Sequence, residues 1–409
     1  MSSEIIVEKL FPFGMILAVL LWSVGAQSQS QESASVLFER AQKAMDERQF
    51  TTALAHLNEC LRKDPYFQDA YLWRARMRQR ANDPLGALTD YSIFLEQVPG
   101  HAEALFSRGT LRVEMKQYAA AREDFQRLLR TPGLETNAVF FQMNPYEGTK
   151  QVLTTQSGGL KPLIYGNLGM IEVHLKNYPK AILYLDSALA LQPKVPEYLL
   201  NKGLAWQYSG EKDQAIATYQ KVLEEDPSNA LAKHNLAQLS RQQGNARQAE
   251  DLLSQAIEEN PSLPYAYAER GFLRMNENNV EGAISDYSQA ILIDPTEPDY
   301  FVNRGILYER QKKYAEAIRN YNQAIKVRNT YAVAWLNRGN AHLKLNKIKE
   351  AIDDYTVAIT FEPDYGLAYL NRAVAFEKWK KTVEACRDAR QAEKLKMTVS
   401  ESFKKSVCR

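Results

Sequence analysis

Small residues and prolines recur along this chain with a period of 34 residues. Gly occupies one phase of the period, and Pro occupies another phase 24 residues later. A third phase holds Ala ten times without a miss: Ala53, Ala87, Ala121, Ala181, Ala215, Ala249, Ala283, Ala317, Ala351 and Ala385. Pro ends a helix because it lacks an N–H and disfavours helix in the residue before it. The pattern predicts pairs of antiparallel helices, which must stack because one pair cannot bury its apolar face alone.

The period divides most of the chain into ten units. Their bounds are 34–67, 68–101, 102–135, 162–195, 196–229, 230–263, 264–297, 298–331, 332–365 and 366–399, and the register breaks only at 136–161. Small residues at unit positions 8 and 20 are expected to let the two helices of a pair approach closely. Large residues at positions 4 and 24 are expected to fill the space between neighbouring units. A charged second helix suits the last unit as a cap, and the tail at 400–409 is too short for another packed pair.

One unit shows the repeated residues clearly. It carries Trp335, Gly339, Ala351, Tyr355, Ala358 and Pro363 at positions 4, 8, 20, 24, 27 and 32. In these residues and spacings the chain resembles the tetratricopeptide repeat (TPR) family. The resemblance implies an all-α fold, a right-handed α-solenoid of ten helix-turn-helix repeats, with repeats 1–3 at 34–135 and repeats 4–10 at 162–399. It also implies a scaffold that binds a protein or peptide partner.

Charged residues at two unit positions occur together. Position 7 is Arg in seven units: Arg40, Arg74, Arg108, Arg270, Arg304, Arg338 and Arg372. Position 23 is Asp in five of these: Asp90, Asp124, Asp286, Asp354 and Asp388. In the other two units Arg40 is matched with His56 and Arg304 with Asn320. We expect partly buried Arg–Asp ion pairs within or between adjacent units, and a binding stripe of arginines is the alternative.

The resemblance further implies that the first helix of each unit lines an inner, concave face. Several positions that would point into this groove are apolar, and position 6 is often Asn, which in peptide-binding family members can hold a peptide backbone. The candidate groove residues are Asn167, Leu200, Asn201, Leu204, Tyr208, His234, Asn235, Tyr265, Phe272 and Ile306. They predict a groove for an extended or helical apolar peptide. The alternative is that these side chains pack against or bond to a neighbouring helix.

The insertion at 136–161 is rich in aromatic residues. Strand-favouring stretches lie on both sides of an Asn-Pro-Tyr-Glu-Gly turn, which predicts a short hairpin or an ordered loop. A segment of this length needs cover for its aromatic residues. Phe140, Phe141 and Tyr146 are therefore candidates either for packing on the repeats or for contacting a partner.

Residues 1–26 have the pattern of a secretory signal. The segment from Leu10 to Ala26 is apolar apart from one Ser, small residues precede the expected cleavage after Ala26, and a polar linker follows at 27–33. Glu4, Glu8 and Pro12 are unusual in such a leader, so an uncleaved signal-anchor that tethers the chain to a membrane is the alternative. Both interpretations place the repeats outside the cytoplasm, periplasmic or secreted.

The three cysteines lack the spacing of a metal site. Cys60 falls on a buried repeat position and is expected in the core. Cys386 and Cys408 lie in the last unit and its tail and could pair in an oxidising compartment. The repeat fold is not expected to depend on a disulfide framework.

Composition and motifs narrow the function to binding. The chain of 409 residues has a net charge of +2, and no run of Lys or Arg suggests nucleic acid. The five histidines are scattered without metal-ligand spacing. No nucleophile elbow, phosphate loop or Cys–His pairing is present in the sequence. We therefore predict a non-enzymatic scaffold without cofactor or metal; a regulatory or substrate-recruiting subunit of a separate envelope enzyme is the alternative.

Overall fold

The computed structural model describes residues 32–131, 139–143, 150–154 and 159–408. It divides into two compact units, the N-terminal unit at 1–192 and the C-terminal unit at 193–409, and we describe each by itself. The predicted leader at 1–26 lies outside the described residues. Among the residues that are described, no helix is both long and apolar enough to cross a membrane.

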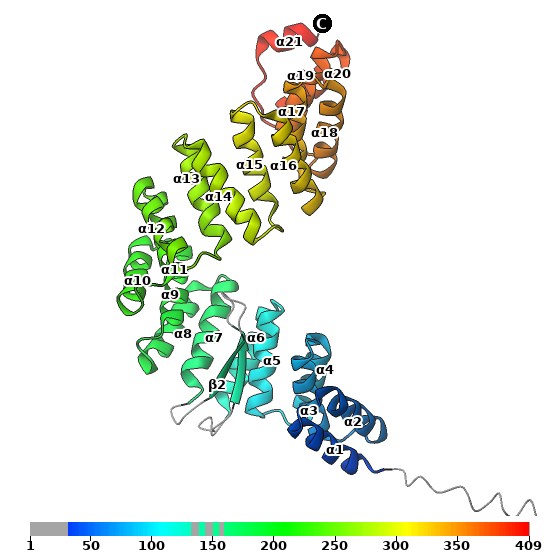
Figure 1. Cartoon of the computed structure of the whole chain (residues 1–409), viewed down its shortest axis with the longest axis vertical. Helices are drawn as coiled ribbons and strands as arrows, with labels where there is room; N and C mark the ends of the chain where they lie inside the picture. The colour runs from blue at the N-terminus through cyan, green and yellow to red at the C-terminus, as the bar shows by residue number, and fades with distance from the viewer. Residues whose placement is uncertain (1–31, 132–138, 144–149, 155–158, 409) are drawn as a thin grey trace, which may run out of the picture. The chain divides into compact units, whose positions relative to one another are not determined.

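The N-terminal unit consists of four helix pairs and a hairpin (Figure 1). Its helices are α1 (Ala34–Asp46), α2 (Phe50–Lys63), α3 (Gln68–Arg80), α4 (Pro84–Gln97), α5 (Ala102–Glu114), α6 (Tyr118–Arg130), α7 (Lys161–His174) and α8 (Tyr178–Leu191). Odd-numbered and even-numbered helices are the first and second members of successive pairs, and each pair stacks on the next. The helix α7 begins at Lys161 and is preceded by the fully buried Leu160, so the inserted segment ends about two residues earlier than predicted.

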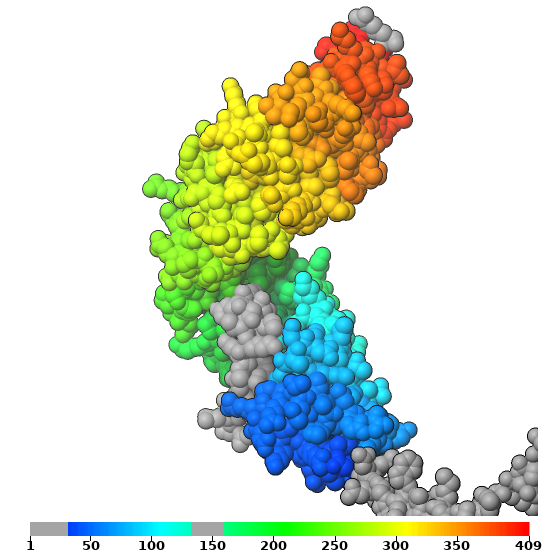
Figure 2. Space-filling model, turned by 45° about the vertical axis from the view of Figure 1, so that its right-hand side comes forward, coloured from blue at the N-terminus to red at the C-terminus, as the bar shows by residue number. Residues whose placement is uncertain are grey.

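The C-terminal unit continues the same arrangement with six further pairs and one short helix. Its helices are α9 (Pro196–Ser209), α10 (Lys212–Glu225), α11 (Ala230–Gln242), α12 (Ala246–Glu259), α13 (Pro264–Asn276), α14 (Val280–Ile293), α15 (Pro298–Arg310), α16 (Tyr314–Val327), α17 (Ala332–Lys344), α18 (Ile348–Phe361), α19 (Gly366–Lys378), α20 (Thr382–Lys394) and α21 (Glu401–Val407). Adjacent pairs from α15 to α18 share one continuous surface (Figure 2, yellow to orange). The predicted fold of stacked helix pairs is confirmed.

Each pair reverses direction at unit position 15, where the backbone is left-handed. Only two of these residues, Gly210 and Gly244, are glycines, with φ of 91° and 84°. The others are Arg48, Asn82, Lys116, Lys176, Asn278, Lys312, Asn346 and Lys380, with φ between 58° and 62°. A side chain at such a φ costs energy, so the turn is imposed by the packing of the two helices that it joins.

Glycine at position 8 lies under the large residue at position 24 of the same pair. A Cβ added to Gly203 would lie 2.3 Å from the ring of Tyr219, and one added to Gly305 would lie 2.5 Å from Tyr321. The prediction that position 24 fills the space between neighbouring units was therefore incomplete, because its ring also closes the gap inside its own pair. The alanines at position 20 are fully buried, as the close approach of the helices requires.

The insertion contains the hairpin that was one of its two predicted structures. Strands β1 (Val139–Met143) and β2 (Lys150–Thr154) pair antiparallel, with Val139 opposite Thr154 and Met143 opposite Lys150. Strand β1 lies beside α5. Phe140 and Phe141 belong to β1, but their side chains and Tyr146 lie outside the described part of the structure. Their predicted contacts stay predictions.

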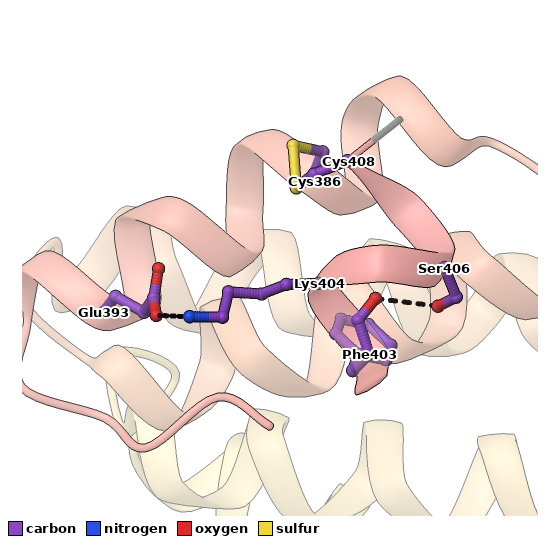
Figure 3. Close-up of a disulfide and its surroundings, with 6 residues drawn as sticks. All are labelled: Cys386, Glu393, Phe403, Lys404, Ser406 and Cys408. Atoms are coloured by element: carbon purple, nitrogen blue, oxygen red, sulfur yellow. Dashed lines mark hydrogen bonds and ion pairs between the residues drawn. A yellow bond between two sulfur atoms is a disulfide. The ribbon is translucent and has the colours of Figure 1, made fainter. Parts of the chain in front are cut away.

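The tail forms a helix that closes the end of the C-terminal unit (Figure 3). A disulfide joins Cys408, just after α21, to Cys386 in α20, with 4.9 Å between the Cα atoms. The Lys404 ammonium is 2.8 Å from Glu393, and Val407 is buried against the last pair. The tail is thus too short for a helix pair, as predicted, but long enough for one docked helix. Cys60 is buried, in agreement with its predicted place in the core.

Candidate binding surface

The inner face of the C-terminal unit is formed by its first helices. Consecutive first helices from α13 to α19 contact one another directly, across the second helix that separates them in sequence. We use the term inner face for the side of α9, α11, α13 and α15 that carries unit positions 2, 5, 6, 9, 12 and 13. Nine of the ten candidate groove residues belong to this unit, and Asn167 belongs to the N-terminal unit.

The structure separates the candidate groove residues by exposure. Tyr208 and Phe272 are exposed, with 59% and 38% of their surface accessible. Leu204, Asn235, Tyr265 and Ile306 are half-buried, whereas Asn167, Leu200, Asn201 and His234 are buried. The alternative of packing against neighbouring helices therefore describes the four buried residues. The other six present surface that a ligand could contact.

The asparagines at position 6 differ in what their amides bond. The side-chain nitrogens of Asn167, Asn201 and Asn337 donate to the carbonyl oxygen four residues earlier in their own helix, at 2.8 to 3.0 Å. Asn371 donates instead to the Oδ1 of Asn340. Within the described parts of the chain, the side chains of Asn235 and Asn303 make no hydrogen bond. These two amides are the ones available to a peptide backbone.

A polar network that sequence reasoning missed crosses the inner face from α9 to α13. Gln207 Nε2 donates to Gln238 Oε1 at 3.3 Å, and Gln238 Nε2 donates to Glu269 Oε1 at 2.6 Å. At one end, Tyr219 donates its hydroxyl hydrogen to Gln207 Oε1 at 2.9 Å. The signal in the sequence is a spacing of 31 residues between partners. It joins position 12 of one unit to position 9 of the next, and position 9 of that unit to position 6 of the one after.

The electrostatics of this network keep Glu269 charged. Burial acts to raise the pKa of Glu269, but the nearby His234, whose Nε2 is 3.4 Å from Glu269 Oε2, and the bond from Gln238 lower it overall. The His234 ring also contacts Tyr265 edge-on, with 4.5 Å between ring centroids. Burial raises the pKa of Tyr265 to about 12, and the charge of Glu269 adds to this, so the phenol stays a hydrogen-bond donor at neutral pH.

Apolar rings and side chains lie between the polar groups of this face. Phe272 is exposed, and the guanidinium of Arg241 lies over its ring at 5.7 Å from the centroid. Exposed Tyr208 and half-buried Leu204 project from α9, and half-buried Ile306 projects from α15. The inner face thus combines apolar contact area with free amides, which is what recognition of an extended peptide needs.

The predicted Arg–Asp pairs are confirmed within single units, and each of these arginines also bonds a residue of the preceding unit. In α5 and α6, Nε and Nη2 of Arg108 donate to the carboxylate of Asp124 at 3.0 and 2.6 Å. The remaining nitrogen, Nη1, donates to Ser92 of the preceding unit at 3.2 Å. The same three bonds recur at Arg74, Arg270, Arg338 and Arg372. These arginines are occupied inside the chain, so they do not form the alternative binding stripe.

We name this series of arginines with their partners at positions 23 and 25 the arginine ladder. Its Asp side chains are almost fully buried, and Asp124 also accepts a bond from Arg112 Nη1 at 2.7 Å. Several ladder arginines lie over the aromatic ring at position 4, such as Arg338 over Trp335 at 4.6 Å. Among the described residues there is no group of three His, Cys, Asp or Glu that could hold a metal ion.

Models of known protein families match several stretches of this chain. Models described as tetratricopeptide repeats match residues 78–134, 167–230, 208–270 and 332–365, and a model described as a TPR repeat matches 310–346. The chain contains tetratricopeptide repeats. The TPR matches fall on helix pairs in both compact units.

The curated relatives share only part of their length with this TPR chain. The DnaJ protein P58IPK homolog B of Oryza sativa subsp. japonica is 27% identical over 228 residues, which are 56% of this chain and 46% of the relative. Superkiller protein 3 of Schizosaccharomyces pombe is 26% identical over 175 residues, 39% of this chain and 13% of the relative. The chain spans less than half the length of either protein.

Solved structures match this chain at low sequence identity. The Cut9–Hcn1 hetero-tetramer of the APC/C is 13% identical, with a TM-score of 0.46, and covers 96% of this chain and 99% of the matched chain. YrrB, described as a TPR protein with an unusual peptide-binding site, is 18% identical, with a TM-score of 0.38, and covers 43% of this chain and 91% of the matched chain.

Proposed function

We propose that this chain is a non-catalytic scaffold that binds an extended segment of a partner protein on the inner face of its C-terminal unit. The observation that carries the proposal is the pairing of unbonded Asn235 and Asn303 amides with exposed apolar side chains on α9 and α13. A backbone of an extended peptide needs donors and acceptors at intervals, and the amide of Asn supplies both.

The surrounding face is ordered before any ligand arrives. The network of Gln207, Gln238 and Glu269 links three successive first helices, and it holds them in fixed register. A preordered site loses less conformational entropy on binding than a flexible one. This supports a groove that recognises its partner through backbone contacts and apolar pockets together.

The proposal includes a location outside the cytoplasm, periplasmic or secreted. The Cys386–Cys408 disulfide supports this location, because stable disulfides are common in oxidising compartments and rare in the cytosol. A chain tethered to a membrane at its N-terminus, or one that recruits substrates for a separate envelope enzyme, would use the same inner face. The mass of the exported protein distinguishes the cleaved chain from the tethered one.

A displayed library of linear peptides, selected on the full chain, tests the inner face. The paired substitutions Asn235→Ala with Asn303→Ala, and Phe272→Ala with Tyr208→Ala, should each weaken binding of the selected peptides at least about tenfold, as loss of central interface contacts does. The matched controls are Asn245→Ala, an exposed Asn without a side-chain cap bond, and Leu292→Ala, an exposed Leu on α14.

The controls should bind the selected peptides as tightly as the unaltered chain does. If both inner-face pairs also bind as tightly, the inner face is not the peptide site. If the Leu292→Ala control weakens binding as much as the Phe272 and Tyr208 pair does, the outer surface of α14 carries the partner and the proposal is wrong.

A further inference from the structure

The arginine ladder has one position at which the carboxylate is absent. Five ladder arginines place Nε and Nη2 on an Asp of their own pair, and Arg40 pairs with Glu32 at 2.6 Å. Arg304, on α15, meets Asn320 of α16 at the corresponding place. Of the seven arginines, Arg304 is the one without a carboxylate within 4 Å in the described part of the structure.

Asn320 supplies one of the two acceptor oxygens that an Asp carboxylate would supply at this place. Its Oδ1 accepts from Arg304 Nε at 2.8 Å, but its Nδ2 is a donor and bonds the carbonyl oxygen of Glu316 at 2.9 Å. Arg304 Nη1 donates to Ser288 Oγ at 3.0 Å, as the ladder pattern requires. Arg304 Nη2 is therefore left without an acceptor among the described residues, where its equivalents in the complete pairs bond a carboxylate oxygen.

A cavity of about 380 Å³ lies beside this guanidinium. Its lining includes Arg304, Tyr308 and Asn320 at the inner end, and exposed Arg319, Asn322 and Gln323. In three complete pairs, the residue at the place of Tyr308 is a second Arg that bonds the ladder Asp: Arg78, Arg112 and Arg274. Beside Arg304, Tyr308 stands in place of the second Arg and Asn320 in place of the Asp, and both line the cavity.

The charge of Arg304 is half-buried without compensation. Burial lowers its pKa, and Tyr308 acts in the opposite direction, yet a guanidinium stays protonated in proteins. Glu316 also lines the cavity, but its carboxylate is directed to Arg319, at 3.3 Å. A partly desolvated cation gains most from an anion with oxygen atoms that reach its free nitrogen.

We infer that the cavity beside Arg304 is a binding site for a carboxylate of a partner molecule, which takes the place that an Asp side chain occupies in the five complete pairs. The ligand oxygen accepts from Arg304 Nη2, and exposed Arg319, which is paired with Glu316, lies in the same lining. Most of the lining belongs to α16, a second helix, so this site is separate from the inner face and does not depend on the proposed peptide groove.

NMR of the full chain labelled with ¹⁵N-arginine tests the site through the Nε–Hε signals. The probes are N-acetylglutamate α-amide, which mimics an acidic side chain, and N-acetylglycine, which mimics a chain terminus, at constant ionic strength. A single charge-assisted contact suggests dissociation constants on the order of 10–100 mM. We expect a saturable shift of the Arg304 signal, assigned by its loss in Arg304→Lys, and no saturable shift of Arg108. The probe that shifts it at lower concentration identifies the source of the carboxylate.

The matched variant is Asn320→Asp, which should fold because five pairs of this chain hold Asp at that place. The new carboxylate fills the site, so the saturable shift of Arg304 should disappear and the midpoint of thermal unfolding should not fall. Acetamide, the uncharged control, should leave the signal unchanged. Absence of a saturable shift at Arg304, or a shift of the same size in Asn320→Asp, would overturn the inference.

Discussion

At the scale of single residues, the closest contact in each pair is between position 8 and position 24. Gly203, Gly305 and Gly339 have no side chain because a tyrosine ring of the facing helix occupies the place of the Cβ. Two of these tyrosine hydroxyls bond a side chain of the facing first helix: Tyr219 bonds Gln207 on the inner face, and Tyr355 bonds Asn340 on α17. One residue pair thus sets both the helix spacing and part of the inner-face polarity.

Replacement of Gly203 by Ala should destabilise the α9–α10 pair. The new Cβ would lie 2.3 Å from Tyr219, so the ring or the helix must move, at a cost of about 1–3 kcal/mol. Hydrogen exchange of α9 and α10 measures the local free energy of opening. The control is Gly100→Ala, because a Cβ at Gly100 would meet no atom within 4 Å. Equal protection of the two variants would contradict this account of the close contact.

Glu309 should make the stability of the C-terminal unit depend on pH. Burial raises its pKa to about 7, although Tyr321 and Lys344 act in the opposite direction. The folded chain then keeps a proton that the unfolded chain loses near pH 4.5, so stability should fall as pH rises from about 4.5 to 7. The stability difference between Glu309→Gln and the unaltered chain, followed by urea unfolding across this range, isolates the effect. A difference that is constant with pH would exclude it.

At the scale of helices, the arginine ladder ties several helix pairs to the pair before them. Each complete ladder Arg bonds an Asp of its own second helix and a Ser, Asn or Thr of the preceding second helix, so three helices meet at one guanidinium. Units four to six lack the pairing. The Gln207–Gln238–Glu269 network instead links α9 and α11, of units five and six, to α13 of unit seven. Helix–helix register is therefore held by different polar groups in different parts of the chain.

Replacement of Asp124 by Asn should weaken the α5–α6 pair. Two arginines, Arg108 and Arg112, converge on this carboxylate, which is 1% exposed, so its neutralisation leaves buried positive charge at a cost of about 2–4 kcal/mol. Hydrogen exchange of α5 and α6 provides the measurement. Arg319→Gln, which removes an exposed ion pair with Glu316, should cost under about 1 kcal/mol. If Asp124→Asn lowers the local free energy of opening no more than Arg319→Gln does, the ladder contributes little stability.

At the scale of the whole molecule, the last described helix pair, α19–α20, is covered by a single short helix. The C-terminal end is closed by α21, with Phe403 and Val407 against the last pair and the disulfide as its anchor (Figure 3). Repeat arrays gain stability from nearest neighbours only. Loss of this cap should therefore act locally and not spread through the stack.

Reduction of the disulfide, or Cys408→Ser, should release α21 and loosen the last pair. The cross-link closes a sequence separation of 22 residues, for which the chain-entropy model gives about 3 kcal/mol. Hydrogen exchange should rise in α19–α21 and stay unchanged in α3–α6. Cys60→Ala, which involves no disulfide, is the control for the loss of a thiol. Unchanged exchange in α21 after reduction would show that the helix docks without its covalent anchor.

The sequence alone determined the helix pairs, their register and the Arg–Asp partners, because these depend on spacings that repeat within the chain. Local rules such as the helix-ending Pro and the small residue at a close approach act identically in every unit. The tertiary structure alone decided which asparagines are free, since Asn201 bonds its own helix and Asn235 does not. It also decided that Arg304 lacks a full partner beside an open cavity. These outcomes depend on which side chains of stacked helices come into contact, and a repeating sequence pattern does not specify each of those contacts.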